Sequence, residues 1–307
     1  MESIVSRQAS AAERLRTHLY RHRNPYLLAL LLLALCILPL AMVPMPKGHD
    51  ILFHLNRIDA LAAEMEAGNI PARIYHTVYG GVGYASGLFY GDWLLYIPAL
   101  LVTAGVGVVT AYKLNIMFVT VLTLFVAYFC ARSAFGDSRS ALTAAVTYGF
   151  SGYFAIDTYT RAAVGGMTAF AFVPLVFLGL WSILCGDRKK WLCLPVGLTF
   201  LLVSHVLSAF IAVLLCAVFF LCYLGRVIRE PRRLLYIGYS VLAFAVLSAS
   251  FLFPMLEQMA STTFLSTDGT SATYYGTLTQ RSLPWWAAVF DFNTRLDYKT
   301  AAFGFWI

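Results

Sequence analysis

Apolar stretches of membrane-spanning length recur along this chain, and they constrain its fold more than any other feature. A transmembrane helix needs about 20 consecutive apolar residues. Runs that approach or reach this length occur at 26–44, 112–131, 138–155, 167–185, 191–204, 206–224 and 234–253. Only 12% of the residues are charged, whereas a soluble domain carries about 25%. We therefore predict an all-α integral membrane protein, a bundle of about seven transmembrane helices.

The N-terminal segment predicts the orientation of the first span. Residues 1–24 are polar and hold five arginines, Arg7, Arg14, Arg16, Arg21 and Arg23. Positively charged flanks stay in the cytoplasm. The run that starts at Tyr26 is of full spanning length, and no small-x-small cleavage site follows it. We expect a basic cytoplasmic N-terminus, an uncleaved signal anchor and a multi-pass protein of the cell membrane.

A further apolar run, 93–110, is ambiguous, and the basic loops decide how it is interpreted. The later short basic loops contain Arg132 and Arg139, then Arg188, Lys189 and Lys190, then Arg226, Arg229, Arg232 and Arg233. All three loops are cytoplasmic only if 93–110 does not cross the membrane, as the positive-inside rule prefers. We therefore predict that 84–110 enters the membrane surface and returns, or lies along it. The net charge of +7 then needs no nucleic acid partner.

This topology divides the chain into three parts. A transmembrane module, 25–260, follows the N-terminus and contains a long first external loop, 45–111. Residues 156–166 form a second external loop, and Ser204–Val206 forms a tight external turn. The segment 261–307 is expected outside the membrane, and its apolar last residues are typical of the start of another span, so we expect a truncated protein.

The first external loop is predicted to begin with an amphipathic helix. Asp50 stands at the N-cap position after two prolines and a glycine, and Gly68 and Pro71 end the helical pattern. Apolar residues at helical spacing (Ile51, Leu55, Ile58, Ala62 and Met65) predict an interfacial helix. Asp50, His54 and Arg57 share one face.

Two interpretations of that polar face remain open. In one, Asp50 only caps the helix, and His54 and Arg57 are solvated. In the other, Asp50 and His54 act together in proton transfer or bind a divalent cation such as Mg²⁺ or Mn²⁺. Nothing in the sequence identifies a cofactor.

Other polar residues gather on the same predicted membrane face. They are Arg73 and His76 after the helix, Asp157 and Arg161 in the second loop, His205 in the tight turn, and Glu257 after the last span. Charged groups at membrane depth usually face a bundle interior or a wet cavity. We predict that Asp50, Asp157 and His205 meet in one external pocket, although His205 alone is equally well explained as a packing residue. The glycine-rich segment 79–90 reads as a mobile loop with interfacial aromatic residues.

Several motifs resemble those of a known family. They are Gly48-His49-Asp50-x-x-Phe53-His54-Leu55-x-Arg57-Ile58, Gly83-Tyr84-x-x-Gly87-x-Phe89-Tyr90, Leu95-Tyr96-Ile97-Pro98-Ala99-Leu100, Tyr159-Thr160-Arg161-Ala162 and Ser204-His205-Val206-Leu207-Ser208. They are similar to bacterial multispanning proteins labelled "6-pyruvoyl-tetrahydropterin synthase-related", whose architecture is similar to that of GT-C glycosyltransferases. The resemblance covers most of residues 30–260. The chain offers no three-histidine zinc site of a pterin synthase, so the GT-C likeness is the informative one.

The resemblance implies a function and a set of site residues. GT-C enzymes use lipid-phosphate sugars on the external face and carry an acidic residue just after the first span, a position that Asp50 matches. Asp157 is a plausible counterpart of a second carboxylate in a later loop. With His54, these two are the candidate catalytic residues. Arg57, Arg73, Arg161 and His205 are candidate ligands of the substrate or its phosphate.

One position departs from the family pattern. We expect an acidic residue soon after Arg161, but Gly166 stands there. Two alternatives to a glycosyltransferase therefore remain: a transporter or flippase of a lipid-linked or anionic solute, and a non-catalytic, truncated membrane scaffold. The spans carry few charges at mid-depth, which argues against a transporter. The lipid bilayer and a polyprenyl-phosphate-linked sugar are the expected partners, and the sequence leaves the oligomeric state open.

Overall fold

The computed structural model describes residues 33–34 and 37–262 of the chain. The predicted cytoplasmic segment 1–24, about half of the first span 26–44 and nearly all of the segment 261–307 lie outside the described residues. The described part is helical, with one isolated bridge between Tyr75 and Tyr84. The expected all-α membrane protein is confirmed.

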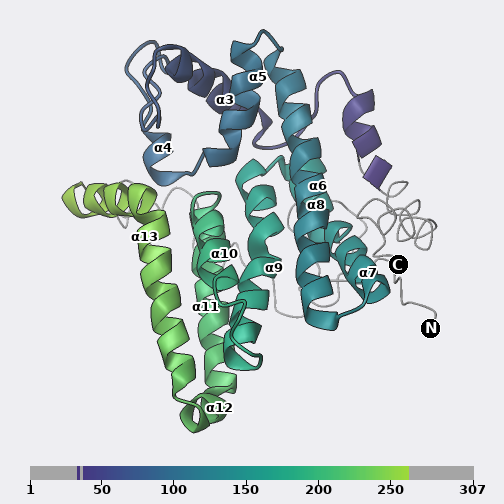
Figure 1. The fold of residues 1–307 in the computed structure, drawn as a ribbon. Helices are drawn as coiled ribbons and strands as arrows, with labels where there is room; N and C mark the ends of the chain where they lie inside the picture. The colour runs from purple at the N-terminus through teal and green to yellow at the C-terminus, as the bar shows by residue number, and fades with distance from the viewer. Residues whose placement is uncertain (1–32, 35–36, 263–307) are drawn as a thin grey trace, which may run out of the picture.

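Three helices in the described part are long and apolar enough to cross a membrane: α6 (Val108–Phe135), α9 (Val164–Leu184) and α13 (Arg232–Ser261). Each extends a predicted span by a few residues at one end or both. Two apolar helices are shorter, α10 (Cys193–Leu202) and α11 (Val206–Cys222). α6, α9, α10 and α13 pack side by side as the body of the bundle, and α11 packs against α9 and α10 (Figure 1).

The predicted span 138–155 is not one helix. It forms α7 (Ser138–Gly149) and α8 (Gly152–Ile156), which continues into the π-helical turn η2 (Asp157–Arg161). The break lies at Ser151, whose hydroxyl accepts a hydrogen bond from the backbone N–H of Phe154 and so starts a new helix. Hydropathy does not detect such a cap, because the residues on both sides are apolar.

The run 93–110 does not form a spanning helix. It folds as the 3₁₀ turn η1 (Trp93–Leu95) and the short helix α5 (Tyr96–Thr103), and α6 begins at Val108. With α3 (Ile51–Glu66) and α4 (Ser86–Phe89), these elements form one end of the molecule, which we call the loop end (Figure 1). At eight residues, α5 is too short to cross a bilayer.

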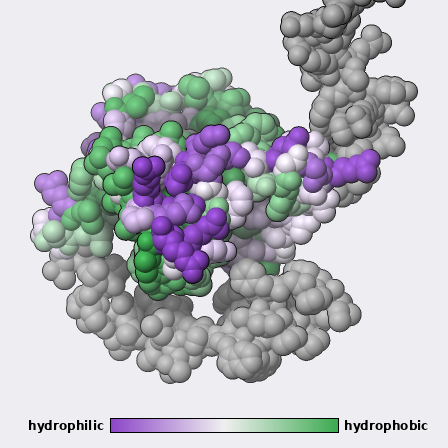
Figure 2. Space-filling view, turned by 60° about the horizontal axis from the view of Figure 1, so that its bottom comes forward, coloured by the Kyte–Doolittle hydropathy of each residue, from purple (hydrophilic) through white to green (hydrophobic). Residues whose placement is uncertain are grey.

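The three later basic segments, 132–139, 188–190 and 226–233, lie together at the opposite end, which we call the basic end. It consists of the α6–α7 loop, the α9–α10 loop and α12 (Leu224–Arg229) with the start of α13. Lys190 Nζ donates to Ser133 O at 2.9 Å, Arg188 pairs with Glu230 at 3.3 Å, and Arg233 Nη1 donates to Ile183 O. Figure 2 shows hydrophilic residues gathered on this end. The three loops therefore share one end, as the charge pattern predicted.

The helix α3 agrees with its predicted bounds but not with its predicted surroundings. Most of its predicted apolar face, Ile51, Leu55, Ile58 and Ala62, is buried, and α3 packs against α5, whereas Leu52 is 64% exposed. The polar face is buried as well: His54 is 1% and Arg57 is 2% exposed. The interpretation in which these two side chains are solvated is therefore wrong, whereas the strip of α3 that includes Leu52, Asn56 and Asp59 is exposed.

Candidate functional site

The start of α3 is tied to the second loop by backbone hydrogen bonds. The N–H of His49 donates to Thr160 O at 3.2 Å, and the N–H of Asp50 donates to Arg161 O at 2.9 Å. Asp50 occupies the predicted N-cap position, but its side chain makes no capping hydrogen bond and is exposed. The sequence folds so that the backbone of Asp50 is fixed while its carboxylate remains accessible to a ligand.

Asp157 and Arg161 form an ion pair beside Asp50. Arg161 Nη1 donates to Asp157 Oδ1 at 2.8 Å. The Asp157 side chain is 1% exposed, whereas that of Arg161 is 43% exposed. Burial raises the pKa of Asp157, the Arg161 charge opposes this shift, and the Asp50 charge adds to it. Arg161 thus uses one nitrogen on a buried carboxylate and presents the rest of its guanidinium to the surface.

Gly166 explains how Asp157 is accommodated. A Cβ atom at this position would lie 2.8 Å from Asp157 Oδ2, closer than real Cβ contacts allow. Asp157 Oδ2 has no hydrogen-bond partner within the described part of the chain. The acidic residue expected at 166 would therefore collide with the carboxylate that is present, and Asp157 is the buried acid of this site.

His205, Tyr90 and His54 form an aromatic row next to this pair. The ring centroid of Tyr90 lies 5.9 Å from that of His205 and 6.0 Å from that of His54. His205 precedes α11 at the predicted tight turn, and its Nδ1 lies 2.8 Å from Ser208 Oγ. Burial lowers the pKa of His205, and the nearby charge of Arg161 lowers it further. His205 is therefore neutral at pH 7.

The burial of His54 predicts a pH-dependent stability. Burial lowers the pKa of His54 to about 3, and Arg57 and then His205 contribute further. Below pH 6.5 the unfolded chain binds a proton that the folded chain does not, so stability falls as the pH falls toward 3. We expect a loss of about 2 kcal/mol between pH 7 and pH 5 from this residue. Thermal unfolding in detergent across this range measures it.

The matched control for His54 is His76, a histidine whose side chain is 66% exposed. We expect His54→Asn to flatten the dependence of the unfolding midpoint on pH and His76→Asn to leave more of it in place. Only the slope is compared, because His54→Asn also changes packing. Equal slopes in the wild type and in His54→Asn would contradict the assignment.

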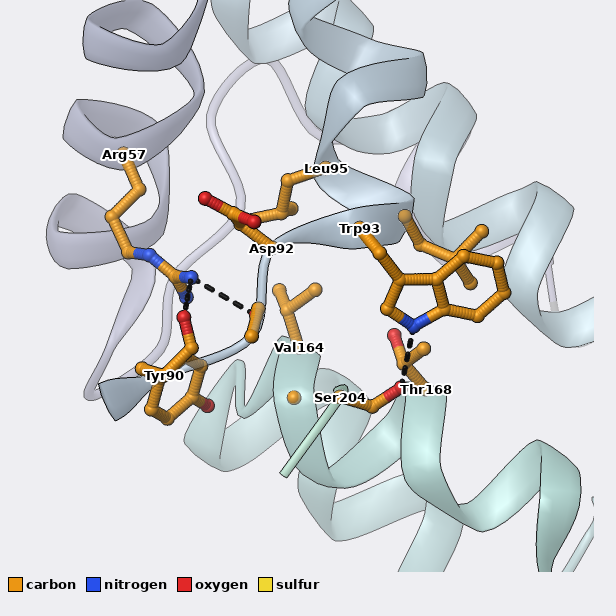
Figure 3. A pocket seen from close by; sticks show the side chains of 11 residues that line it. Arg57, Tyr90, Asp92, Trp93, Leu95, Val164, Thr168 and Ser204 are labelled. Carbon is orange, nitrogen blue, oxygen red and sulfur yellow. Dashed lines mark hydrogen bonds between the residues drawn. The ribbon is translucent and has the colours of Figure 1, made fainter. Parts of the chain in front are cut away.

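Arg57 joins α3 to the segment that follows α4. Its Nη2 donates to Tyr90 O and to Gly91 O, each at 3.1 Å, and its guanidinium lies 4.3 Å from the centre of the Tyr90 ring. Figure 3 shows Arg57 beside a small cavity of about 10 Å³, which is room for a single water molecule at most. This cavity is not lined by Asp50, Asp157 or His205. Arg57 holds Tyr90 in place.

Sequence reasoning missed Tyr90, Asp92 and Tyr75. Tyr75 Oη donates to Asp92 Oδ2 at 2.8 Å, and burial raises the pKa of Asp92 while the nearby Arg57 charge opposes that shift. Trp93 Nε1 donates to Ser204 Oγ at 2.9 Å and so ties the same segment to the turn of His205. The segment 79–90 looked like a mobile loop because glycine and aromatic residues dominate it. The available signal was Asp92, an acid two residues after the end of that segment.

Arg73 lies apart from this group. Its Nη2 donates to Ser250 O at 2.9 Å. Ser250 lies four residues before Pro254 in α13. Because proline has no N–H, the carbonyl of Ser250 receives no helical hydrogen bond from position 254. Arg73 therefore caps a proline-freed carbonyl near the bend of α13 (Figure 1). Glu257 lies beyond this bend and is exposed.

The structure thus brings together most of the candidate residues. Asp50, Asp157, Arg161, His205, His54 and Arg57 are linked by the contacts and charge interactions above, with Tyr90 at their centre. Within residues 33–34 and 37–262, no group of three or more His, Cys, Asp or Glu side chains is placed to hold a metal ion. Asp50 and His54 do not form such a group.

The model of a family described as "Bacterial membrane protein YfhO" matches residues 86–297. A protein of Lactococcus lactis subsp. cremoris (strain MG1363), described as an uncharacterized protein, is 24% identical over 250 residues, which cover 77% of this chain and 40% of that relative. The chain thus spans about two fifths of the relative's length. No solved structure matches it. A bacterial membrane protein family matches, as expected, but it is not the pterin synthase-related family that the sequence motifs resembled.

Proposed function

Because this chain belongs to the YfhO family of bacterial membrane proteins, we propose that it is a membrane glycosyltransferase of the GT-C type. It transfers a sugar from a polyprenyl-phosphate donor to an acceptor on the non-cytoplasmic face. The observation that carries the proposal is the exposed carboxylate of Asp50, fixed through its backbone to Arg161 O. A carboxylate and a cation, adjacent at one end of a membrane bundle, match a reaction between a hydroxyl and a sugar phosphate.

The orientation follows from the charge pattern. The basic end faces the cytoplasm by the positive-inside rule. The site at the loop end then faces outward, where the sugar of a polyprenyl-phosphate donor protrudes from the lipid. The donor's isoprenoid tail lies among the apolar helices.

The chemical step assigns a role to each group. Asp50 accepts the proton of the acceptor hydroxyl as its oxygen attacks the anomeric carbon. The bond between that carbon and the phosphate oxygen breaks, and polyprenyl phosphate leaves. Arg161 neutralises the phosphate through the exposed part of its guanidinium. Asp157 orients Arg161, and Tyr90 and His205 line the approach as uncharged groups. In the alternative role that the sequence leaves open, Asp50 binds a divalent cation.

Arg161 is favoured over the other two candidate arginines as the phosphate ligand. Arg57 is 2% exposed and donates to two backbone carbonyls. Arg73 donates to α13 and lies apart from Asp50. Neither is free to bind a phosphate without giving up a contact that holds the fold.

The test uses membrane vesicles from cells that express the chain, supplied with polyprenyl-phosphate donors carrying radiolabelled glucose, mannose or N-acetylglucosamine. A transferase moves label from the lipid-soluble fraction into a product that no longer extracts with lipid, beyond the level of vesicles without the chain. A transporter moves label across the bilayer and leaves it lipid-linked. Label that stays lipid-linked with all three donors contradicts the proposal for these sugars.

A further inference from the structure

A second cavity lies away from the proposed transfer site, between α6, α7 and α9. Its volume is about 300 Å³. Small residues of α6 form one wall, Ala127, Ala131 and Ala134, and aromatic residues of α9 form the other, Phe177 and Trp181. The cavity is a groove open to the surroundings of the bundle, since Phe135 at its rim is 63% and Trp181 is 49% exposed.

The groove occupies the part of the bundle next to the basic end. It runs along α6 from Ala127 to Phe135, the last residue of that helix. The eight helical steps from Ala127 to Phe135 rise about 12 Å, which is less than half of the roughly 30 Å hydrocarbon core. The groove therefore lies in the leaflet on the side of the basic loops, and Asp50 and Arg161 lie at the other end of the molecule.

Water does not suit this groove. Its lining side chains are apolar except for the Trp181 indole N–H, the Cys130 thiol and the Tyr148 hydroxyl, which already donates to Phe170 O at 2.6 Å. Apolar cavities stay dry and take up apolar ligands. In a membrane, the available apolar ligand is the hydrocarbon chain of a lipid.

A cation without an acidic partner lies at the end of the groove. Lys190 Nζ is half-buried and donates to Ser133 O, one residue before Ala134 of the groove wall. Its two neighbours in the loop are paired: Lys189 lies 3.5 Å from Asp187, and Arg188 lies 3.3 Å from Glu230. No carboxylate pairs with Lys190 among the described residues. An ammonium has three donors, so Lys190 keeps two of them for a ligand.

We infer that this groove binds one acyl chain of an anionic phospholipid whose phosphate contacts Lys190. The apolar walls take the chain, and the unpaired ammonium selects the negatively charged head group. The inference does not depend on the proposed transfer reaction, because the groove lies at the opposite end from Asp50. The inference predicts that the protein prefers anionic over uncharged phospholipids, which an apolar helix surface without Lys190 would not do.

The test compares dioleoyl phosphatidylglycerol with dioleoyl phosphatidylcholine, which share the same chains. Purified protein in detergent is titrated with each lipid, and the thermal unfolding midpoint is measured. We expect phosphatidylglycerol to raise the midpoint by roughly 2–4 °C more than phosphatidylcholine. Lys190→Gln should remove this difference, and Lys190→Arg should restore most of it. Lys189→Gln is the matched control in the same loop and should behave as the wild type.

The chain-binding part is tested by filling the groove. Ala131→Phe should reduce the response to both lipids, and Ala217→Phe, on the exposed face of α11, should not. Ala131→Leu repeats the test with a smaller side chain if Ala131→Phe does not unfold cooperatively, and mass spectrometry of co-purified lipid gives a second readout. Equal responses of the wild type to the two lipids overturn the inference. The inference is also overturned if the lipids raise the unfolding midpoints of Ala131→Phe and Ala217→Phe equally.

Discussion

Asp50→Asn is expected to reduce sugar transfer by about 10²–10⁴-fold, the usual contribution of a general base, while the protein folds normally. Asparagine has nearly the same shape and is an equally good N-cap residue. The contact that fixes position 50 is the backbone N–H bond to Arg161 O, which the substitution keeps, and the Asp50 side chain makes no capping bond that would be lost. Transfer is measured with the radiolabelled donors in vesicles, and folding by thermal unfolding.

The control for Asp50→Asn is Asp59→Asn. Asp59 is an exposed carboxylate on the same helix, with the same charge and the same chemical change. We expect it to transfer sugar at the wild-type rate. If Asp50→Asn also transfers normally, Asp50 has no part in the mechanism.

A chelator separates the two roles left open for Asp50. If the carboxylate binds a divalent cation, EDTA should stop transfer by the wild type, and added Mg²⁺ or Mn²⁺ should restore it. If Asp50 is the base alone, EDTA should leave the rate unchanged. Asp50→Asn is inactive in both cases, so this comparison uses the wild-type protein.

The long apolar helices could be predicted from the sequence, because burial in lipid requires uninterrupted apolar composition. α6, α9 and α13 each overlap a predicted run, and α6 and α13 add turns that contain polar residues, such as Arg132 in α6 and Arg232 in α13. Those added turns lie beyond the apolar run itself, so hydropathy does not mark them. The split at Ser151 was missed for a related reason, since a single hydroxyl decided it.

The polar part of the candidate site was also predictable, because Asp50, Asp157, Arg161 and His205 are conspicuous in so apolar a chain. Their neighbours were not. Tyr90 reaches them only because Arg57 holds its carbonyl at 3.1 Å, a contact between residues 33 positions apart. Arg73 was assigned to phosphate because of its charge, whereas its contact with Ser250 O depends on Pro254, far along the chain.

Gly91→Ala is expected to disrupt both the fold and the site, because Gly91 lies where the first loop touches the α10–α11 turn. A Cβ atom at Gly91 would overlap the backbone oxygen and the carbonyl carbon of Val203. Backbone atoms cannot move aside as a flexible side chain can. The two segments must separate, which weakens the Arg57 bond to Gly91 O and the Trp93 bond to Ser204 and moves His205 away from Tyr90.

We expect Gly91→Ala to lower the free energy of unfolding by about 3 kcal/mol or more, and the unfolding midpoint by roughly 6–12 °C. Transfer should be lost with it, since Tyr90 and His205 lose their positions beside Arg161. The control is Gly238→Ala in α13, where nothing lies within 4 Å of the added Cβ. A methyl group at that helical position should be neutral or stabilising. If the two variants unfold at the same temperature, the contact between Gly91 and Val203 is not what holds the first loop against the turn of His205.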